Sequence, residues 1–175
     1  MPANYNGLKN NVQNYLEGQG AANTSEAAQY FADQCMSQVL TKVNPSANGV
    51  NTVLPANNAT IKGAFDAAFN ACNIPKNGDL ANNIGIWTTV ASTWGTAVSF
   101  PAWAEAPPLF TYATIGAAGV PAGGALLYEA FGPNAKSAGV VAGKFKDAIK
   151  AVMDGVTYTK TNINTLATAP GTGLS

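Results

Sequence analysis

The sequence contains no histidine, so acid–base chemistry would have to come from carboxylates, lysine, tyrosine or cysteine. Glycoside hydrolysis, for example, needs two acids held close together on either side of the bond. The nine acidic residues are scattered singly, and Glu105 and Glu129 are the ones in apolar surroundings. We interpret each of these two as an acid at a helix end or in a polar contact between subunits. We therefore predict no catalytic residue and expect a protein that is not an enzyme.

The two cysteines, Cys35 and Cys72, lie far apart and form no CxxC pair. A cysteine nucleophile needs a base, and histidine, the usual base and the commonest metal ligand, is missing. The glycine-rich segments 116–119 and 123–124 are not followed by the Lys-Ser or Lys-Thr of a phosphate-binding loop. No metal and no cofactor is predicted. We interpret the cysteines as two small buried side chains; the alternative is one disulfide joining two helices in an oxidising compartment.

The charge pattern bears on possible partners. Positive and negative charges balance, and every basic residue is a lysine. Without arginine for bidentate contacts, and with no basic run beyond Lys144, Lys146 and Lys150, we do not expect nucleic acid as a partner. Charged residues make up 10% of the chain, whereas an average soluble domain has about 25%. A surface of Asn, Thr, Ser and Gln does not repel neighbouring copies, so we expect a subunit of a packed assembly or a protein outside the cell.

One long stretch has almost no charge: between Asp79 and Glu129, Glu105 is the single charged residue, and all three tryptophans fall here. Asp79 is a good N-cap for the helix expected over 80–100. Its apolar positions follow spacings of four and three residues, which is typical of the seam of a packed helix. These positions are Leu80, Ile84, Trp87, Ala91, Trp94 and Val98.

Hydrophobic periodicity predicts the other helices. We expect them over 5–16, 23–43, 59–72, 122–131 and 134–158, and we expect residues 167–175 to form a flexible tail. Asn23 and Glu26 offer a capping start to the second helix, and Lys62 and Asp66 are spaced for an i,i+4 pair on the third. The fold class predicted is all-α: a single helical domain over residues 1–175, formed by a bundle of four or five helices.

Residues 101–124 are predicted to form a long apolar loop or arm rich in proline and glycine. Such long loops are uncommon in compact domains and usually have a function. A short β segment is possible at Phe110–Ile115. The loop carries too many apolar residues for a solvated linker, so we expect it to contact another subunit. The interface residues predicted are Trp103, Leu109, Phe110, Tyr112, Ile115 and Val120.

Three segments carry a resemblance to a known class of protein: Thr24–Asp33, Ile61–Phe69, and Ile86–Trp94 with the proline-rich segment after it. In these segments the chain resembles small virion structural proteins of tailed bacteriophages, which open on helices and then have an apolar arm and a closing helix. The resemblance covers residues 20–160 and is one of style, without an invariant motif. It implies a head, neck or tail subunit, present in several copies in the virion and made in the host cytoplasm, whose partners are other copies of itself and other structural subunits. It names no functional residues.

Two alternatives remain open. The first is a secreted or surface-exposed helical protein, such as a filament subunit, although the segment 1–5 has none of the features of a signal peptide. The second is a membrane-active protein, because the uncharged runs are long enough to span a bilayer. Asn82, Asn83 and the adjacent prolines Pro107 and Pro108 argue against membrane insertion, since unpaired backbone is costly in hydrocarbon.

Overall fold

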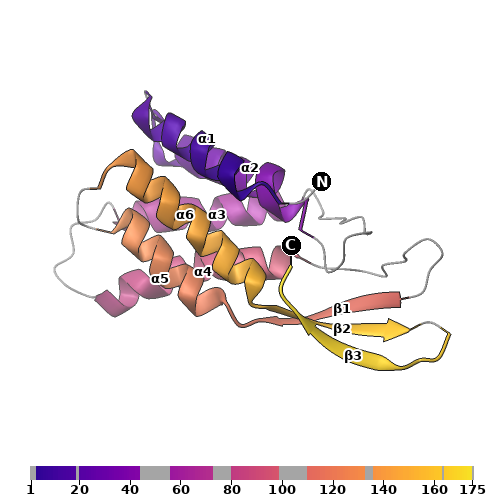
Figure 1. The fold of residues 1–175 in the computed structure, drawn as a ribbon. Helices are drawn as coiled ribbons and strands as arrows, with labels where there is room; N and C mark the ends of the chain where they lie inside the picture. Colours follow the sequence, from indigo (N-terminus) through magenta and orange to yellow (C-terminus); the bar gives the residue numbers. More distant parts are fainter. Residues whose placement is uncertain are drawn as a thin grey trace.

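The computed structural model describes residues 3–18, 20–43, 56–72, 80–98, 110–132, 136–162 and 164–174, with only the backbone described for residues 56, 80–82 and 110–115. Figure 1 shows the helices and strands of the described residues. They are α1 (Tyr5–Glu17), α2 (Thr24–Cys35), the π-helical turn η1 (Met36–Leu40), α3 (Ala56–Cys72), α4 (Leu80–Ala97), β1 (Phe110–Ala117), α5 (Val120–Phe131), α6 (Ala138–Asp154), β2 (Val156–Asn162) and β3 (Thr168–Thr172).

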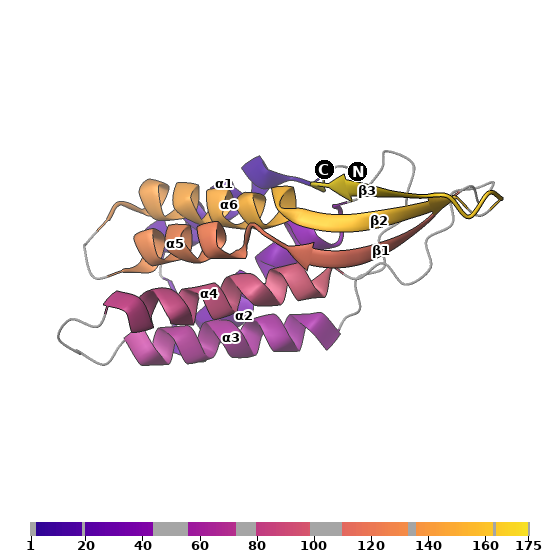
Figure 2. The same cartoon turned by 90° about the horizontal axis from the view of Figure 1, so that it is seen from below.

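The all-α prediction is correct for the larger part of the described chain and wrong for the rest. The described residues form a mostly helical fold with six α-helices and a small three-stranded antiparallel sheet. In Figures 1 and 2 the sheet extends away from one end of the helical bundle, and both chain termini lie at that end. The possible β segment at Phe110–Ile115 is confirmed as β1, whereas β2 and β3 were not expected.

The helices pack in a ring around an aromatic core. Going round the ring, α1 packs on α6, α6 on α5, α5 on α4, α4 on α3, α3 on α2, and α2 on α1. Phe31 of α2 lies in the middle, with its ring centroid 5.6 Å from that of Phe65, 5.2 Å from Phe131 and 5.1 Å from Phe145. Aromatic rings at such spacings add to the stability gained by burying their large surfaces.

The α4 seam predicted from sequence is confirmed for the side chains that the structure describes. Trp87, Ala91, Trp94 and Val98 are buried, and Ile84 is half-buried. The opposite face exposes small uncharged residues, among them Thr89 and Thr96. Their hydroxyls donate to carbonyl oxygens of the preceding helical turn, Thr89 to Gly85 at 3.1 Å for example. This outer face therefore satisfies its own hydroxyl donors within the helix.

Local capping explains where the first two helices begin. Asn4 accepts a hydrogen bond from the backbone N–H of Gly7 at 2.9 Å, and Asn23 accepts one from Glu26 at the same distance. The Glu26 carboxylate accepts a hydrogen bond from the N–H of Ala22. Asn23 and Glu26 therefore cap the start of α2 together, as the sequence indicates. The Lys62–Asp66 pair predicted on α3 does not form: the Lys62 ammonium donates to Ser25, and Asp66 accepts from Asn70.

Two predicted boundaries are wrong at the C-terminal end. The last long helix ends at Asp154, four residues before the predicted Tyr158, because Gly155 caps it and the alternating run from Val156 pairs as β2. Residues 167–175 were expected to be a flexible tail, but Thr168–Thr172 pair with β2 as β3. Gly173 then adopts φ +80°, and Leu174 enters the core, where its side chain is 4% exposed.

Candidate functional site

The sheet β1–β2–β3, which we call the arm, is the feature of this fold that a helical bundle does not need for its own core. Its strand order is β1-β2-β3, all antiparallel. Val156 at the start of β2 is buried, but every later described residue of β2 is only half-buried. The described residues of β3 are exposed, apart from the half-buried Gly171. Beyond Val156, no described side chain of β2 or β3 is fully buried, so this part of the sheet gains little from the hydrophobic effect.

The arm is fixed to the bundle through glycines. The backbone N–H of Ala118 donates to Gly155 at 2.8 Å, where β1 enters α5 and α6 enters β2. Ala117 lies against α4, because a Cβ on Gly95 would be 2.6 Å from the Ala117 Cβ. Between Thr114 and Gly116 the register of β1 against β2 shifts by one residue. Such a bulge increases the local twist, and it separates the part of β1 at the bundle from the part that extends outward.

The faces of the central strand differ in chemistry. Thr157, Thr159 and Thr161 lie on one face of β2, opposite Thr172, Pro170 and Thr168 of β3. On the other face, Tyr158 lies opposite Gly171, and a Cβ on Gly171 would be 2.4 Å from the tyrosine ring. The tyrosine ring therefore covers the glycine backbone of the neighbouring strand. The arm presents hydroxyl and aromatic groups, with Lys160 as the one charged residue of its strands.

The turn between β2 and β3 exposes a leucine at the end of the arm. Leu166 is 76% exposed and adopts φ +56°, the one non-glycine residue with positive φ among those described. Its N–H donates to the carbonyl oxygen of Asn162 at 2.8 Å. The Asn162 side chain accepts bonds from the N–H groups of Asn164 and Thr165 at 2.9 and 3.1 Å. These bonds tie the backbone of residues 164–166 to Asn162, and Leu166 is left with its apolar side chain in water and its backbone in a costly conformation.

The interface residues predicted from sequence divide into three groups. Trp103 and Leu109 lie outside the described residues. Phe110, Tyr112 and Ile115 fall on β1, in the arm, where the backbone alone is described. Val120 begins α5 and packs against the core near Gly95, so it belongs to the bundle.

Sequence reasoning missed Leu166 and the β2–β3 hairpin. The signal that could have found β2 is the alternation Val-Thr-Tyr-Thr-Lys-Thr from Val156 to Thr161, a period of two in β-favouring residues. No comparable signal marks β3, whose sequence Thr-Ala-Pro-Gly-Thr reads as a polar loop. Leu166 is an isolated leucine within that polar region.

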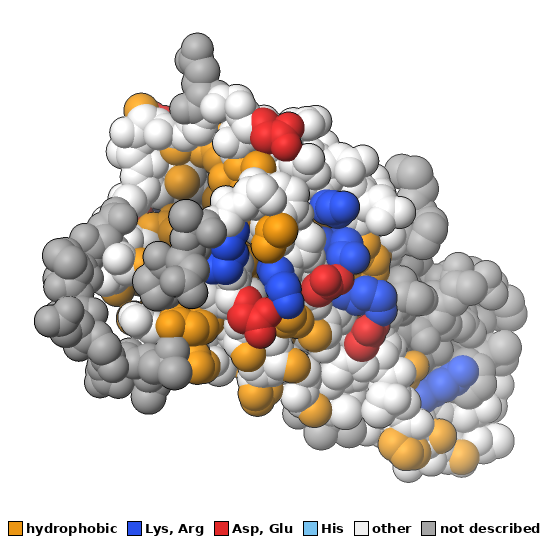
Figure 3. Space-filling view, turned by 60° about the vertical axis from the view of Figure 1, so that its left-hand side comes forward, with side chains coloured by type: hydrophobic (Ala, Val, Ile, Leu, Met, Phe, Trp, Pro, Cys, Tyr) orange, Lys and Arg blue, Asp and Glu red, His pale blue; other side chains and the backbone are white. Residues whose placement is uncertain are grey.

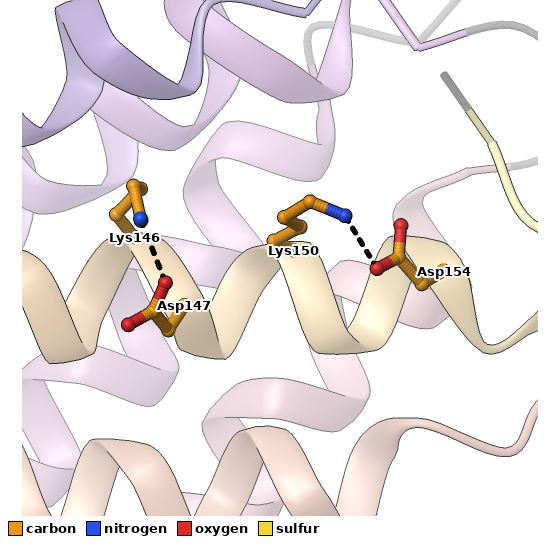
Figure 4. Close-up of polar contacts among 4 residues, drawn as sticks. All are labelled: Lys146, Asp147, Lys150 and Asp154. Atoms are coloured by element: carbon orange, nitrogen blue, oxygen red, sulfur yellow. Dashed lines mark hydrogen bonds and ion pairs between the residues drawn. The ribbon is translucent and has the colours of Figure 1, made fainter.

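A band of charged residues lies on the surface of α6, away from the arm. In Figure 3 lysine and acidic side chains form one band over this face. Figure 4 shows Lys146 beside Asp147 at 2.8 Å and Lys150 beside Asp154 at 2.6 Å. Lys144 pairs with Glu129 of α5, and this contact raises the pKa of the lysine. Each lysine of the cluster noted in the sequence therefore has an acidic partner, and the band is close to neutral.

Amide side chains connect α1 and its N-cap to the next two helical segments, α2 and η1. The Asn11 side chain donates to Gln34 at 2.8 Å, and the Asn4 side chain donates to Gln38 at 3.1 Å. Tyr30 stacks on Tyr15, with ring centroids 3.8 Å apart, and its hydroxyl donates to the Asn11 carbonyl. Neutral polar contacts of this kind hold helices together without adding charge to the surface.

The cysteines differ from the prediction in one respect. Cys35 is buried, as expected, and burial raises the pKa of its thiol well above the usual value. Cys72 is exposed, so the prediction of two buried side chains is wrong for this residue. The two thiols are not bonded to one another. Within the described ranges, no group of three or more acids and cysteines is placed to hold a metal ion.

Among the helices that the structure describes, none is both long and apolar enough to cross a bilayer. Comparison with models of protein families, with curated proteins and with solved structures gave no match.

Proposed function

We propose that this protein is a non-enzymatic structural subunit of a multi-copy assembly and that the arm is one of its contact surfaces. The observation that carries the proposal is the exposed, strained Leu166 at the end of an arm in which no described side chain of β2 or β3 beyond Val156 is fully buried. A monomer gains nothing from holding a leucine in water at a cost of about 1–2 kcal/mol in backbone strain. Burial of that leucine in a neighbouring subunit would offset the strain and supply an apolar anchor for the contact.

The assembly proposed is the virion of a tailed bacteriophage, in which the chain would be a head, neck or tail component. Support comes from the resemblance of the segments Thr24–Asp33, Ile61–Phe69 and Ile86–Trp94 to small structural proteins of such particles. It comes also from the low charge of the chain and from the neutral amide contacts between its helices. The partners would be other copies of this chain and other structural subunits of the particle.

A matched pair of substitutions tests the arm as a contact surface. Leu166 and Val140 are the large hydrophobic residues exposed in the described part of the chain, 76% and 48% respectively. Leu166→Asn removes the apolar anchor and gives the position a residue that tolerates positive φ. We expect this variant to be more stable as a monomer and to assemble less, by native mass spectrometry and sedimentation. Val140→Asn, on α6, is the control and should leave assembly unchanged.

The outcomes separate clearly. A stability gain together with weaker assembly supports the proposal, because no loss of folding can explain it. Assembly that is unaffected by Leu166→Asn would remove the arm tip from the interface. A wild-type protein that stays monomeric at high concentration would contradict the proposal of a self-assembling subunit. Substitution is a sharper test than deletion of residues 101–124, because that deletion would remove β1 and the start of α5.

A further inference from the structure

The two outer edges of the arm differ in their ability to bind another strand. Three backbone hydrogen bonds show which groups of β2 point to which neighbouring strand: Ala118 N–H to Gly155, Gly173 N–H to Val156, and Asn162 N–H to Ala167. Backbone groups in a strand alternate from side to side. Even-numbered residues of β2 therefore bond to β3, and odd-numbered residues bond to β1.

The same alternation identifies the backbone groups on the outer edges. On β1, Thr111 and Ala113 lie opposite Thr161 and Thr159 and so bond to β2. The N–H and C=O groups of Phe110, Tyr112 and Thr114 point away from the sheet, and no other strand of the described chain pairs with them. On β3, the outward residues are Thr168, Pro170 and Thr172.

Proline closes one of these edges. Pro170 has no N–H group and occupies the middle outward position of β3, which is where natural sheets place proline to prevent edge pairing. The outward row of β1 contains no proline and keeps all three donors. The sequence Phe-Thr-Tyr-Ala-Thr-Ile-Gly-Ala is uncharged and rich in β-favouring residues. An unprotected strand of this kind is a template for another strand.

From this asymmetry we infer that β1 pairs, antiparallel, with β1 of a second copy, so that the two arms form one continuous sheet across a two-fold axis at Tyr112. This inference rests on the proposed function, because it names the partner that the arm meets. The outward row is self-complementary: Tyr112 faces Tyr112 of the copy, and Phe110 faces Thr114. Each facing pair exchanges two backbone hydrogen bonds.

Two further features favour a second copy over an unrelated strand. Because β1 has no charge, two copies approach without repulsion, which a row of like charges would cause. Because Pro170 blocks the opposite edge, pairing stops at two copies and gives a closed two-fold contact instead of an open fibre. The bulge between Thr114 and Gly116 marks where the paired segment ends and the bundle begins.

The register can be tested by disulfide cross-linking in a Cys72→Ser background, which removes the exposed native thiol. Under mild oxidation, Tyr112→Cys should cross-link to itself, since facing Cα atoms in such a pair lie about 5.5 Å apart. Thr114→Cys alone should not cross-link, because its symmetry mate lies four residues along the strand. Thr114→Cys mixed with Phe110→Cys should give a cross-linked heterodimer. Cross-linking of Thr114→Cys to itself, or none by Tyr112→Cys, overturns the inference.

A pair of proline substitutions adds an independent measurement. Tyr112→Pro removes one outward donor from β1 and no bond to β2, so the monomer should fold and the two-fold contact should be lost. Thr168→Pro makes the same change on the edge that Pro170 already blocks and should leave association unchanged. Equal effects of the two, with helical circular dichroism retained in both, would overturn the inference.

Native mass separates this inference from the proposed function. Assembled protein without the Tyr112 cross-link would mean that copies meet elsewhere, so the inference fails and the proposed function stands. Protein that is monomeric in every variant contradicts both. If the β1 edge instead binds a strand of a different protein, the purified chain is monomeric in every variant.

Discussion

Gly119 and Gly155 are in backbone contact at the point where the arm leaves the bundle. A Cβ on Gly155 would lie 2.2 Å from the backbone nitrogen of Gly119, and one on Gly119 would lie 1.9 Å from the carbonyl oxygen of Ala151. Both glycines have negative φ, −77° and −91°. Glycine is therefore required at both positions because a side chain would not fit there, and not because the backbone adopts a positive φ. The contact sets where β1 and β2 begin relative to α5 and α6.

This contact predicts a large cost for a small change. Gly155→Ala places a methyl group against backbone atoms that cannot rotate away, so the start of α5 and the end of α6 must separate. We expect a loss of about 1–3 kcal/mol or more in the free energy of unfolding, measured by urea denaturation. The control is Gly143→Ala on α6, where a Cβ would meet no atom within 4 Å. That change should stabilise the helix by about 0.5–1 kcal/mol. Similar effects of the two would contradict the close approach.

Leu174 should anchor the C-terminal strand. Its side chain is 4% exposed, and its N–H donates to the carbonyl of Met153 at 3.1 Å. Leu174→Ala should lower the free energy of unfolding by about 2 kcal/mol, the low end for a buried leucine because it lies near the chain end. Leu166→Ala, at an exposed position, should change stability by less than about 0.5 kcal/mol. Equal and small effects would mean that residues 167–175 behave as the flexible tail expected from sequence.

Burial of the Tyr5 hydroxyl should make stability sensitive to alkaline pH. Burial first, and the charge of Asp154 second, raise the pKa of Tyr5 above its usual 10.0. Above about pH 10 the unfolded chain releases this proton while the folded chain keeps it, so stability falls as pH rises. Tyr5→Phe should reduce that fall between pH 10 and 12, as followed by thermal melts. At pH 7 it should be close to neutral, because the hydroxyl is buried without a partner.

The helices could be predicted because their information is local. Asn23 and Glu26 mark the start of α2, and the positions of Trp87 and Trp94 give the buried face of α4. The spacing of apolar residues within one helix determines which of its faces is buried, and this spacing can be read from that segment alone. For α1, the predicted range 5–16 agrees with Tyr5–Glu17 to within one residue.

The arm could not be predicted in full because its pairing is non-local. Phe110 pairs with Asn162, and neither segment alone shows that the other is available to form these backbone hydrogen bonds. β3 contains Pro170 and Gly171, which normally end strands, and it pairs because it lies on the outer edge. The predicted continuation of the last helix to Tyr158 failed because Gly155 and the threonine alternation favour a strand there. Three of the residues predicted for an interface therefore fall on β1, whereas the β2–β3 turn was not predicted.

The two thiols should react in different states of the protein. Cys72 is exposed and should react with a disulfide reagent such as DTNB in the native state, whereas the buried Cys35 should react only after unfolding. Partial burial raises the pKa of the Cys72 thiol above its usual 9.0. Because the thiolate is the reactive form, its rate should keep rising as pH passes 9, where a free thiol levels off. Cys72→Ser should abolish the native-state reaction and leave the Cys35 thiol detectable after unfolding in guanidinium. Two thiols that react at the same rate in the native state would contradict the burial of Cys35, and with it the packing of α2 against the aromatic core.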